Sequence, residues 1–184
     1  ESLFFDPKNT RAGIVTCGGL CPGQNNVIRS LVLELHHGYG VREILGFVNG
    51  YQGLDPWHGA EPIPLTPKFV EDIHKEGGTV LNTSRGPVDV SVAVDNLVRR
   101  KINMLFVIGG DGTQRGGEAI YQEAKLRGHA LAVVGVQERR LVLLRGQGRG
   151  DGRVHPATDA DDRQRLHTPR PFSGQRWRWS WICR

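Results

Sequence analysis

An apolar run that ends in a glycine-rich loop constrains this chain more than any other feature. Residues 104–108 read Met-Leu-Phe-Val-Ile, which predicts a buried strand. A Gly-Gly-Asp-Gly-Thr loop follows at 109–113, and a helix-like stretch begins at Arg115. Glycines let a backbone approach phosphate closely, and a helix N-terminus directs N–H groups at anions. Because an aspartate among such amides suits magnesium, the loop predicts a nucleoside polyphosphate site with Mg²⁺ on Asp111.

The rest of residues 1–136 alternates between strand and helix patterns. The predicted strands are 12–17, 41–48, 79–81, 104–108 and 130–136, and the predicted helices are 24–37, 66–75, 89–101 and 115–128. Residues 54–65 read as a proline-containing loop. This alternation predicts an α/β fold with a parallel sheet and helices on both faces. Ligands bind such sheets beyond the carboxyl ends of the strands, so the glycine loops at 18–23 and 109–113 are expected to meet at one site.

Charge and composition divide the chain after residue 136. Residues 1–136 carry 13 basic and 14 acidic residues, whereas 137–184 carry 11 basic residues, all of them Arg, and 5 acidic ones. The basic balance of the whole chain therefore belongs to its last part. That part shows neither a helical nor a strand period and has few aliphatic residues, so it cannot supply a packed core. We expect a nucleotide-binding α/β domain at 1–136 and an irregular Arg/Gly/Trp-rich tail at 137–184.

Cysteine usage and hydropathy indicate a compartment. Three cysteines, at positions 17, 21 and 183, make no disulfide framework in a chain of 184 residues, which suits a reducing environment. The sequence shows no signal peptide pattern and no apolar run long enough to span a bilayer. We therefore expect a cytoplasmic protein with no membrane partner.

Three segments taken together resemble the phosphofructokinase family. The first is Gly-Gly-Leu-Cys-Pro-Gly-Gln-Asn at 18–25, which looks like the family's first phosphate loop. The second is Asp-Ile-His-Lys-Glu-Gly-Gly-Thr at 72–79, leading to Thr-Ser-Arg at 83–85. The third, at 109–116, looks like its magnesium-nucleotide loop. The resemblance is to the plant-type and related bacterial branch, and it implies the Rossmann-like N-terminal half of the phosphofructokinase fold.

The resemblance also implies an activity. The family transfers a phosphoryl group from Mg-ATP to the 1-hydroxyl of fructose 6-phosphate in glycolysis, as homo-oligomers. The nucleotide-binding residues that carry over are Gly18, Arg85, Gly86, Gly110, Asp111, Gly112 and Thr113. Asp111 would hold Mg²⁺, and the Arg85 guanidinium suits bidentate phosphate binding. Gln114 and Arg115 are interpreted either as nucleotide contacts or as solvent-facing residues at a helix start.

The residue after Asp111 bears on the phosphoryl donor. Family members that use pyrophosphate typically carry Asp there, which crowds and repels ATP. This chain has Gly112, so ATP is the expected donor and pyrophosphate the alternative. NAD kinases and lipid kinases share the Gly-Gly-Asp-Gly-Thr core, but they have no place for the segments at 18–25 and 72–85.

The chain departs from the family after Val136. The resemblance predicts Pro-Lys-Thr-x-Asp-Asn-Asp, whose first aspartate is the base that accepts the sugar hydroxyl proton. The chain reads Gln-Glu-Arg-Arg-Leu at 137–141, so no catalytic residue is assigned and the chain alone is expected to be inactive. An Arg-rich, Lys-free tail is typical of a GC-rich gene read out of frame, and we interpret 137–184 in that way.

Two other functions remain open from the sequence. One is a nucleotide-binding module without catalysis. The other is nucleic-acid binding through the Arg and Trp residues of the tail, which would stack on bases and neutralise phosphates. The second is disfavoured, because the charge lies on no recognisable nucleic-acid-binding fold.

Overall fold

The computed structural model describes residues 5–57 and 59–137, in which five strands form one sheet of order β3-β2-β1-β4-β5. The strands are β1 (Arg11–Thr16), β2 (Glu43–Phe47), β3 (Ile63–Pro64), β4 (Met104–Gly109) and β5 (Ala132–Gln137). The pairs β1–β2, β1–β4 and β4–β5 are parallel, and β3 runs antiparallel to β2. The predicted α/β fold is confirmed, with one short antiparallel strand added at the edge.

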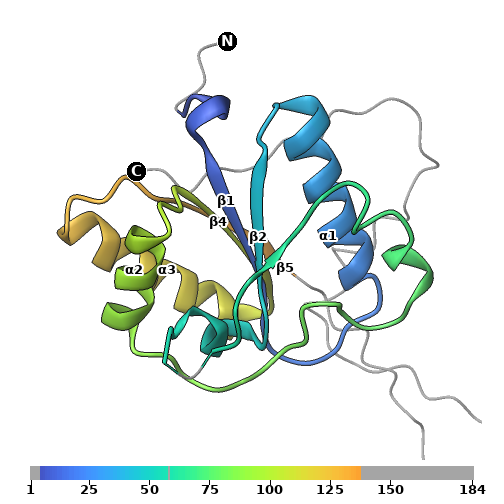
Figure 1. The fold of residues 1–184 in the computed structure, drawn as a ribbon. Helices are drawn as coiled ribbons and strands as arrows, with labels where there is room; N and C mark the ends of the chain where they lie inside the picture. The colour runs from blue at the N-terminus through green and yellow to red at the C-terminus, as the bar shows by residue number, and fades with distance from the viewer. Residues whose placement is uncertain (1–4, 58, 138–184) are drawn as a thin grey trace, which may run out of the picture. The chain divides into compact units, whose positions relative to one another are not determined.

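Three α-helices cover the two faces of the sheet. They are α1 (Gln24–Leu33), α2 (Val90–Arg99) and α3 (Asp111–Leu126). Short helical segments also occur at η1 (Pro7–Asn9), η2 (Glu34–Gly38), η3 (Gly50–Leu54) and η4 (Ile73–Lys75). Helix α1 lies on one face, and α2 and α3 lie on the other (Figure 1). None of these helices has the length and apolar content needed to cross a membrane.

Alternation along the strands supplies both halves of the core. Ile14 of β1 and Phe106 of β4 point into the cluster under α1, while Val15 and Leu105 belong to the cluster under α2 and α3. Successive side chains of a strand face opposite sides of the sheet, and a parallel sheet is buried on both. This is why these strands read in the sequence as continuous apolar runs rather than as alternating ones.

The connections place a switch point between β1 and β4. From β1 the chain passes through α1 to β2 on one side, and it later returns to β4 on the other side of β1. At the end of this strand pair Thr16 lies opposite Ile108, and the Cys17 N–H donates to the Ile108 carbonyl at 2.9 Å. The loops that follow the two strands therefore start side by side, where open α/β sheets bind ligands.

The edge strand β3 replaces part of the loop predicted at 54–65. Ile63 and Pro64 lie opposite Gly46 and Leu45, and the Leu65 N–H donates to the Ile44 carbonyl at 2.8 Å. Proline fits here because an edge strand leaves one side of its backbone without a partner strand. Two residues are too few to produce a readable alternation.

The helix predicted at 66–75 is wrong. Thr66 does act as a cap, since its hydroxyl accepts from the Phe69 N–H at 3.1 Å. Only one α-turn follows, however, and the chain then forms turns and the short segment η4. Arg29 of α1 donates to the Glu71 carbonyl at 3.3 Å, so this carbonyl is held by a neighbouring helix. Tertiary contact overrides a good local helix start.

The strand predicted at 79–81 is also wrong, because these residues form a turn. The turn is closed by a hydrogen bond of 3.1 Å from the Asn82 N–H to the Thr79 carbonyl. Buried Asn25 holds it from α1, donating to the Glu76 carbonyl at 3.1 Å and accepting from the Val80 N–H at 2.8 Å. A side chain thus uses the backbone groups that a strand ladder would need.

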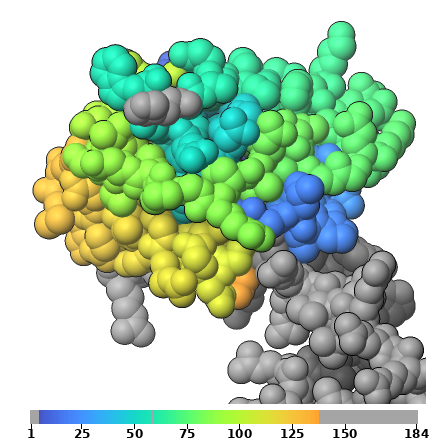
Figure 2. Space-filling view, turned by 90° about the horizontal axis from the view of Figure 1, so that it is seen from below, coloured from blue at the N-terminus to red at the C-terminus, as the bar shows by residue number. Residues whose placement is uncertain are grey.

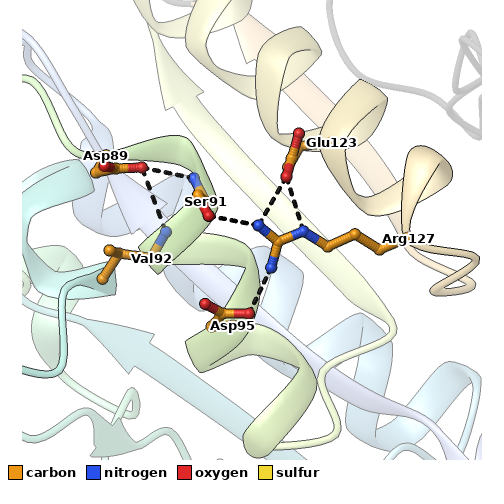
Figure 3. A network of polar contacts seen from close by, with 6 residues as sticks. All are labelled: Asp89, Ser91, Val92, Asp95, Glu123 and Arg127. Atoms are coloured by element: carbon orange, nitrogen blue, oxygen red, sulfur yellow. Dashed lines mark hydrogen bonds and ion pairs between the residues drawn. The ribbon is translucent and has the colours of Figure 1, made fainter.

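A cluster of polar side chains joins α2 to α3 (Figure 3). Arg127, at the end of α3, bonds to Glu123 of its own helix at 2.7 Å and also to Asp95 and Ser91 of α2. Asp89 caps α2 by accepting from the Ser91 N–H at 2.8 Å. The Glu123 hydrogen bond, followed by the charge of Asp95, raises the pKa of Arg127, so the guanidinium stays charged. The bonds from Arg127 to Asp95 and Ser91 thus tie the C-terminal end of α3 to α2. The N-terminal end of α3 begins at Asp111, in the glycine loop.

Candidate functional site

A cleft of about 970 Å³ opens at the carboxyl ends of the strands. Figure 2 shows this side of the molecule: the blue segment after β1, the light-green segment before α2 and the yellow start of α3 lie next to one another. The structure brings together all the site residues predicted from the sequence. The predicted residues that line the cleft are Gly18, Arg85, Gly86, Gly110, Asp111, Gly112 and Thr113.

The loop after β1 is fixed by the segment at 82–84. Gly18 has a φ of +98°, which an L side chain rarely adopts, and its N–H donates to the Ser84 carbonyl at 3.0 Å. The Thr83 hydroxyl donates to the Gly18 carbonyl at 3.0 Å in return. Both backbone groups of Gly18 are therefore used within the protein. Gly18 offers a ligand close approach rather than a hydrogen-bond donor.

The same segment delivers Arg85 and Gly86 to the cleft. The Arg85 guanidinium lies over Gly19, where an added Cβ would stand 3.3 Å from its Nη2 atom. A Cβ on Gly86 would lie 2.0 Å from the side-chain Nε2 of Gln52, so Gly86 leaves room for the end of that side chain. Arg85 is exposed and is the cation that the cleft presents from this side.

Helix α3 begins at Asp111, four residues before the start predicted at Arg115. Gly110 is the N-cap in an extended conformation, and its carbonyl accepts from the Gln114 N–H at 3.1 Å. Residues 111–113 therefore form the first turn, whose N–H groups have no acceptor within a helix and carry its positive end. The glycine loop is itself the helix N-terminus, which strengthens the predicted attraction for phosphate.

Tyr51 of η3 was missed from the sequence, although it lines the cleft. Its hydroxyl donates to the Thr113 carbonyl, and a Cβ on Gly116 would lie 2.5 Å from the Tyr51 ring. Burial raises the pKa of Tyr51 well above its usual range, so the phenol remains a donor. The Gly116-Gly117 pair inside α3 is the signal that could have indicated such a close approach.

The Gln114 side chain is neither at the nucleotide cleft nor simply solvent-facing, because it bonds to the backbone of the protein. Its side-chain amide donates to the carbonyls of Gly109 at 3.1 Å and Val136 at 3.4 Å. A Cβ on Gly135 would lie 1.9 Å from its Oε1 atom, so that glycine makes room for it. Gln114 thus ties the start of α3 to the ends of β4 and β5. Neither it nor Arg115 is among the residues that line the cleft.

Asp111 is the carboxylate that the cleft presents, and it has one close side-chain partner. Gln137, the last residue of β5, donates from Nε2 to Asp111 Oδ1 at 2.9 Å. Within residues 5–57 and 59–137 no group of three or more His, Cys, Asp or Glu side chains could hold a metal by itself. One carboxylate beside a phosphate-binding helix start fits magnesium, which keeps several waters and is bound by one or two carboxylates and the phosphates of a ligand.

Comparison with known proteins agrees with this geometry. Residues 11–138 match the phosphofructokinase family, and the chain belongs to that family. Over 136 residues it is 50% identical to ATP-dependent 6-phosphofructokinase 4, chloroplastic, of Arabidopsis thaliana, covering 74% of this chain and 25% of that one. It is 51% identical to the ATP-dependent 6-phosphofructokinase of Borreliella burgdorferi, again over 74% of this chain and 30% of the relative. The chain thus spans between a quarter and a third of these relatives.

Solved structures show the same fold. Phosphofructokinase from Pichia pastoris in the T-state matches with a TM-score of 0.62 and 27% identity, over 76% of this chain and 16% of that one. A pyrophosphate-dependent phosphofructokinase from Marinobacter aquaeolei matches with a TM-score of 0.58 over 68% of this chain and 32% of that one. At 17% identity, the second match bears on the fold alone.

Two predictions concern residues beyond the described part. The interpretation of the tail as out of frame and the alternative of nucleic-acid binding both fall on 138–184, outside the described residues. Gln137, which the sequence assigned to the tail, is the last residue of β5 and lines the cleft.

Proposed function

We propose that this chain binds Mg-ATP in the cleft between the two glycine loops, as the N-terminal part of an ATP-dependent 6-phosphofructokinase. One observation carries the proposal: the residues that the family resemblance selects, from three separate segments, all line one cleft at the switch point of the sheet. The relatives named above are ATP-dependent 6-phosphofructokinases, which supports ATP as the donor. The volume of about 970 Å³ is in the usual range for small-molecule sites.

The walls of the cleft suit the parts of a nucleotide. The N–H groups of the first turn of α3 and the guanidinium of Arg85 would bind the phosphates from two sides. The partly buried apolar side chains of Val88 and Val90 also line the cleft and would contact the base. Asp111 would hold Mg²⁺, which neutralises the charge on the transferring phosphoryl group when bound.

Fructose 6-phosphate as the acceptor, a homo-oligomeric assembly and a cytoplasmic location are further proposals, and they rest on the family resemblance. Here the chain is expected to bind the donor without completing the transfer. The resemblance predicts the base as the fifth residue after Val136, where this chain has Leu141, and the expected Asp-containing motif is absent from the sequence. We expect no fructose 6-phosphate-dependent formation of ADP by the purified chain in a coupled assay. Measurable turnover would contradict this inactivity.

Substituting the carboxylate tests the binding proposal. Asp111→Asn keeps the size of the side chain and removes the charge that would hold Mg²⁺. We expect the wild-type chain to bind ATP more tightly with Mg²⁺ than with EDTA. In the variant the ratio of these two affinities should fall at least about tenfold, which is about 1.4 kcal/mol. Isothermal titration calorimetry in both buffers measures the effect.

Asp72→Asn is the matched control. Asp72 is exposed, precedes η4 and pairs with Lys75 at 2.6 Å, and it does not line the cleft. This variant should bind ATP as the wild-type chain does in both buffers. Equal magnesium dependence in Asp111→Asn and wild type would remove Asp111 from the proposed metal site.

A further inference from the structure

We propose that Gln137 is a positioning residue that restrains the carboxylate of Asp111 and so weakens the preference of this cleft for metal-bound over metal-free nucleotide. The inference rests on the proposed function and adds to it a residue outside the predicted nucleotide-binding set. Its physical basis is the hydrogen bond of 2.9 Å from Gln137 Nε2 to Asp111 Oδ1, which joins two exposed side chains at the cleft that both residues line.

The backbone places Gln137 where this contact can form. In the parallel pair β4–β5, Gln137 lies opposite Gly109, the first glycine of the loop that leads to Asp111. A strand register fixes which residue stands opposite which, so the Gln137 side chain is delivered to the mouth of the loop. The contact therefore follows from the sheet and from the start of α3.

A second glutamine holds the same junction. Gln114 donates to the carbonyls of Gly109 and Val136 and so links the start of α3 to the ends of both strands. It leaves little freedom for β5 to move away from Asp111. Gln114 thus holds the backbone around the loop, while Gln137 holds the carboxylate that the loop presents.

The chemistry of the contact predicts in which direction the loss of the Gln137 amide should change the affinity for a metal-bound nucleotide. A carboxylate oxygen that accepts an amide N–H is held in one orientation, and one of its lone pairs is no longer open to a metal ion. Releasing the amide should therefore help Asp111 to bind a metal. Metal-free ATP gains nothing from that release, because an unshielded carboxylate repels its phosphates. The effect should appear in the ratio of the two affinities.

The residue type at this position sets this chain apart from the family pattern. The resemblance predicts proline directly after Val136, and proline has no side-chain donor. Glutamine at 137 supplies an amide that reaches Asp111. The sequence departs from the family at the position where β5 enters the site, so the departure changes the surroundings of Asp111 as well as removing the base.

The experiment measures the dissociation constant of ATP for the full 184-residue chain by calorimetry, once with Mg²⁺ and once with EDTA. The readout is the ratio of the EDTA value to the Mg²⁺ value. Gln137→Ala should raise this ratio about two- to tenfold, the effect of one hydrogen bond to a carboxylate. Gln137→Met, which has nearly the same shape and no N–H donor, should raise it by a similar factor.

Gln122→Ala is the matched control. Gln122 also donates from Nε2 to a carboxylate of α3, that of Glu118 at 2.6 Å, but neither residue lines the cleft. This variant should leave the ratio unchanged. Circular dichroism checks that each variant is folded, and Gln137→Met provides an independent test should Gln137→Ala fold poorly.

The possible outcomes distinguish the role of Gln137 from the proposed binding of ATP. A raised ratio in both Gln137 variants, with no change in Gln122→Ala, supports the inference. An unchanged ratio in both, while the wild-type chain binds ATP with a clear Mg²⁺ dependence, overturns the inference and leaves the proposed function standing. Absence of ATP binding by the wild-type chain overturns the proposed function and the inference together.

Discussion

The Gly109→Ala variant is expected to unfold about 5–15 °C below the wild-type chain, because the added methyl group costs about 1–3 kcal/mol of folding free energy. Its Cβ would stand 2.4 Å from the Thr113 hydroxyl and 2.5 Å from the Cys17 carbonyl oxygen. The hydroxyl can rotate, but the carbonyl belongs to the backbone. Cys17 is held beside β4 by its hydrogen bond to Ile108, so relief requires the ends of β1 and β4 to separate.

Gly110→Ala is the control for this steric argument. An added Cβ at Gly110 meets no heavy atom of the described residues within 4 Å, and its φ of −81° is open to any residue. The melting temperature of this variant, followed by circular dichroism, should stay close to that of wild type. Equal destabilisation by both substitutions would contradict the assignment of Gly109 as the glycine that packing requires.

The parts of the fold that could be predicted are those with a strong local signal. The strand–glycine–helix units built on β1 and β4 combine a buried apolar run, a loop that only glycine suits and an amphipathic helix. Asp89 gave a sharp start for α2, and its side chain does cap that helix. Since these signals lie within a few residues of each other, sequence alone suffices to read them.

The errors arise where distant residues compete for the backbone. The Thr66 cap is real, yet a single α-turn follows it, and beyond that turn the Glu71 carbonyl is bonded to Arg29 of α1. Asn25 similarly takes the Val80 N–H that a strand would have used. Neither partner is near its target in sequence, so no local pattern reveals the competition.

The sequence predicted that a set of residues would meet at one cleft, but it missed others that line the cleft, such as Tyr51 and Gln137, and much of the geometry. All the predicted residues reach one cleft, because loops after adjacent parallel strands must emerge together. The orientation of the Gly18 amide toward Ser84 and the contact of Tyr51 with Thr113 depend on tertiary packing. The sequence contains no pattern for the first, and for the second only the Gly116-Gly117 pair indicates that something approaches α3 closely. Gln137 was assigned to the tail because the family motif was missing there.

The Gly112→Asp variant is expected to keep its fold and lose ATP binding by at least about tenfold. Gly112 is exposed in the first turn of α3, and an added Cβ meets no heavy atom of the described residues within 4 Å. A carboxylate in that turn interacts favourably with the helix dipole, by about 0.3–1 kcal/mol. Toward a phosphate about 4 Å away the same charge is repulsive by about 1–4 kcal/mol, so stability and affinity should change in opposite directions.

Gly112→Asn separates charge from crowding, because it has nearly the same size and no charge. If repulsion dominates, Gly112→Asn should bind ATP much better than Gly112→Asp in calorimetric titrations with Mg²⁺. Pyrophosphate carries phosphate charge but brings no nucleoside into the cleft, so it should lose less affinity than ATP where crowding of the nucleoside contributes and as much where charge repulsion alone acts. Equal losses in both variants would show that crowding decides, and unchanged ATP binding in Gly112→Asp would place the phosphates away from the start of α3. The expected result ties the donor to a single position: with glycine there the positive end of α3 is open to a triphosphate, and with aspartate it is already neutralised by the protein.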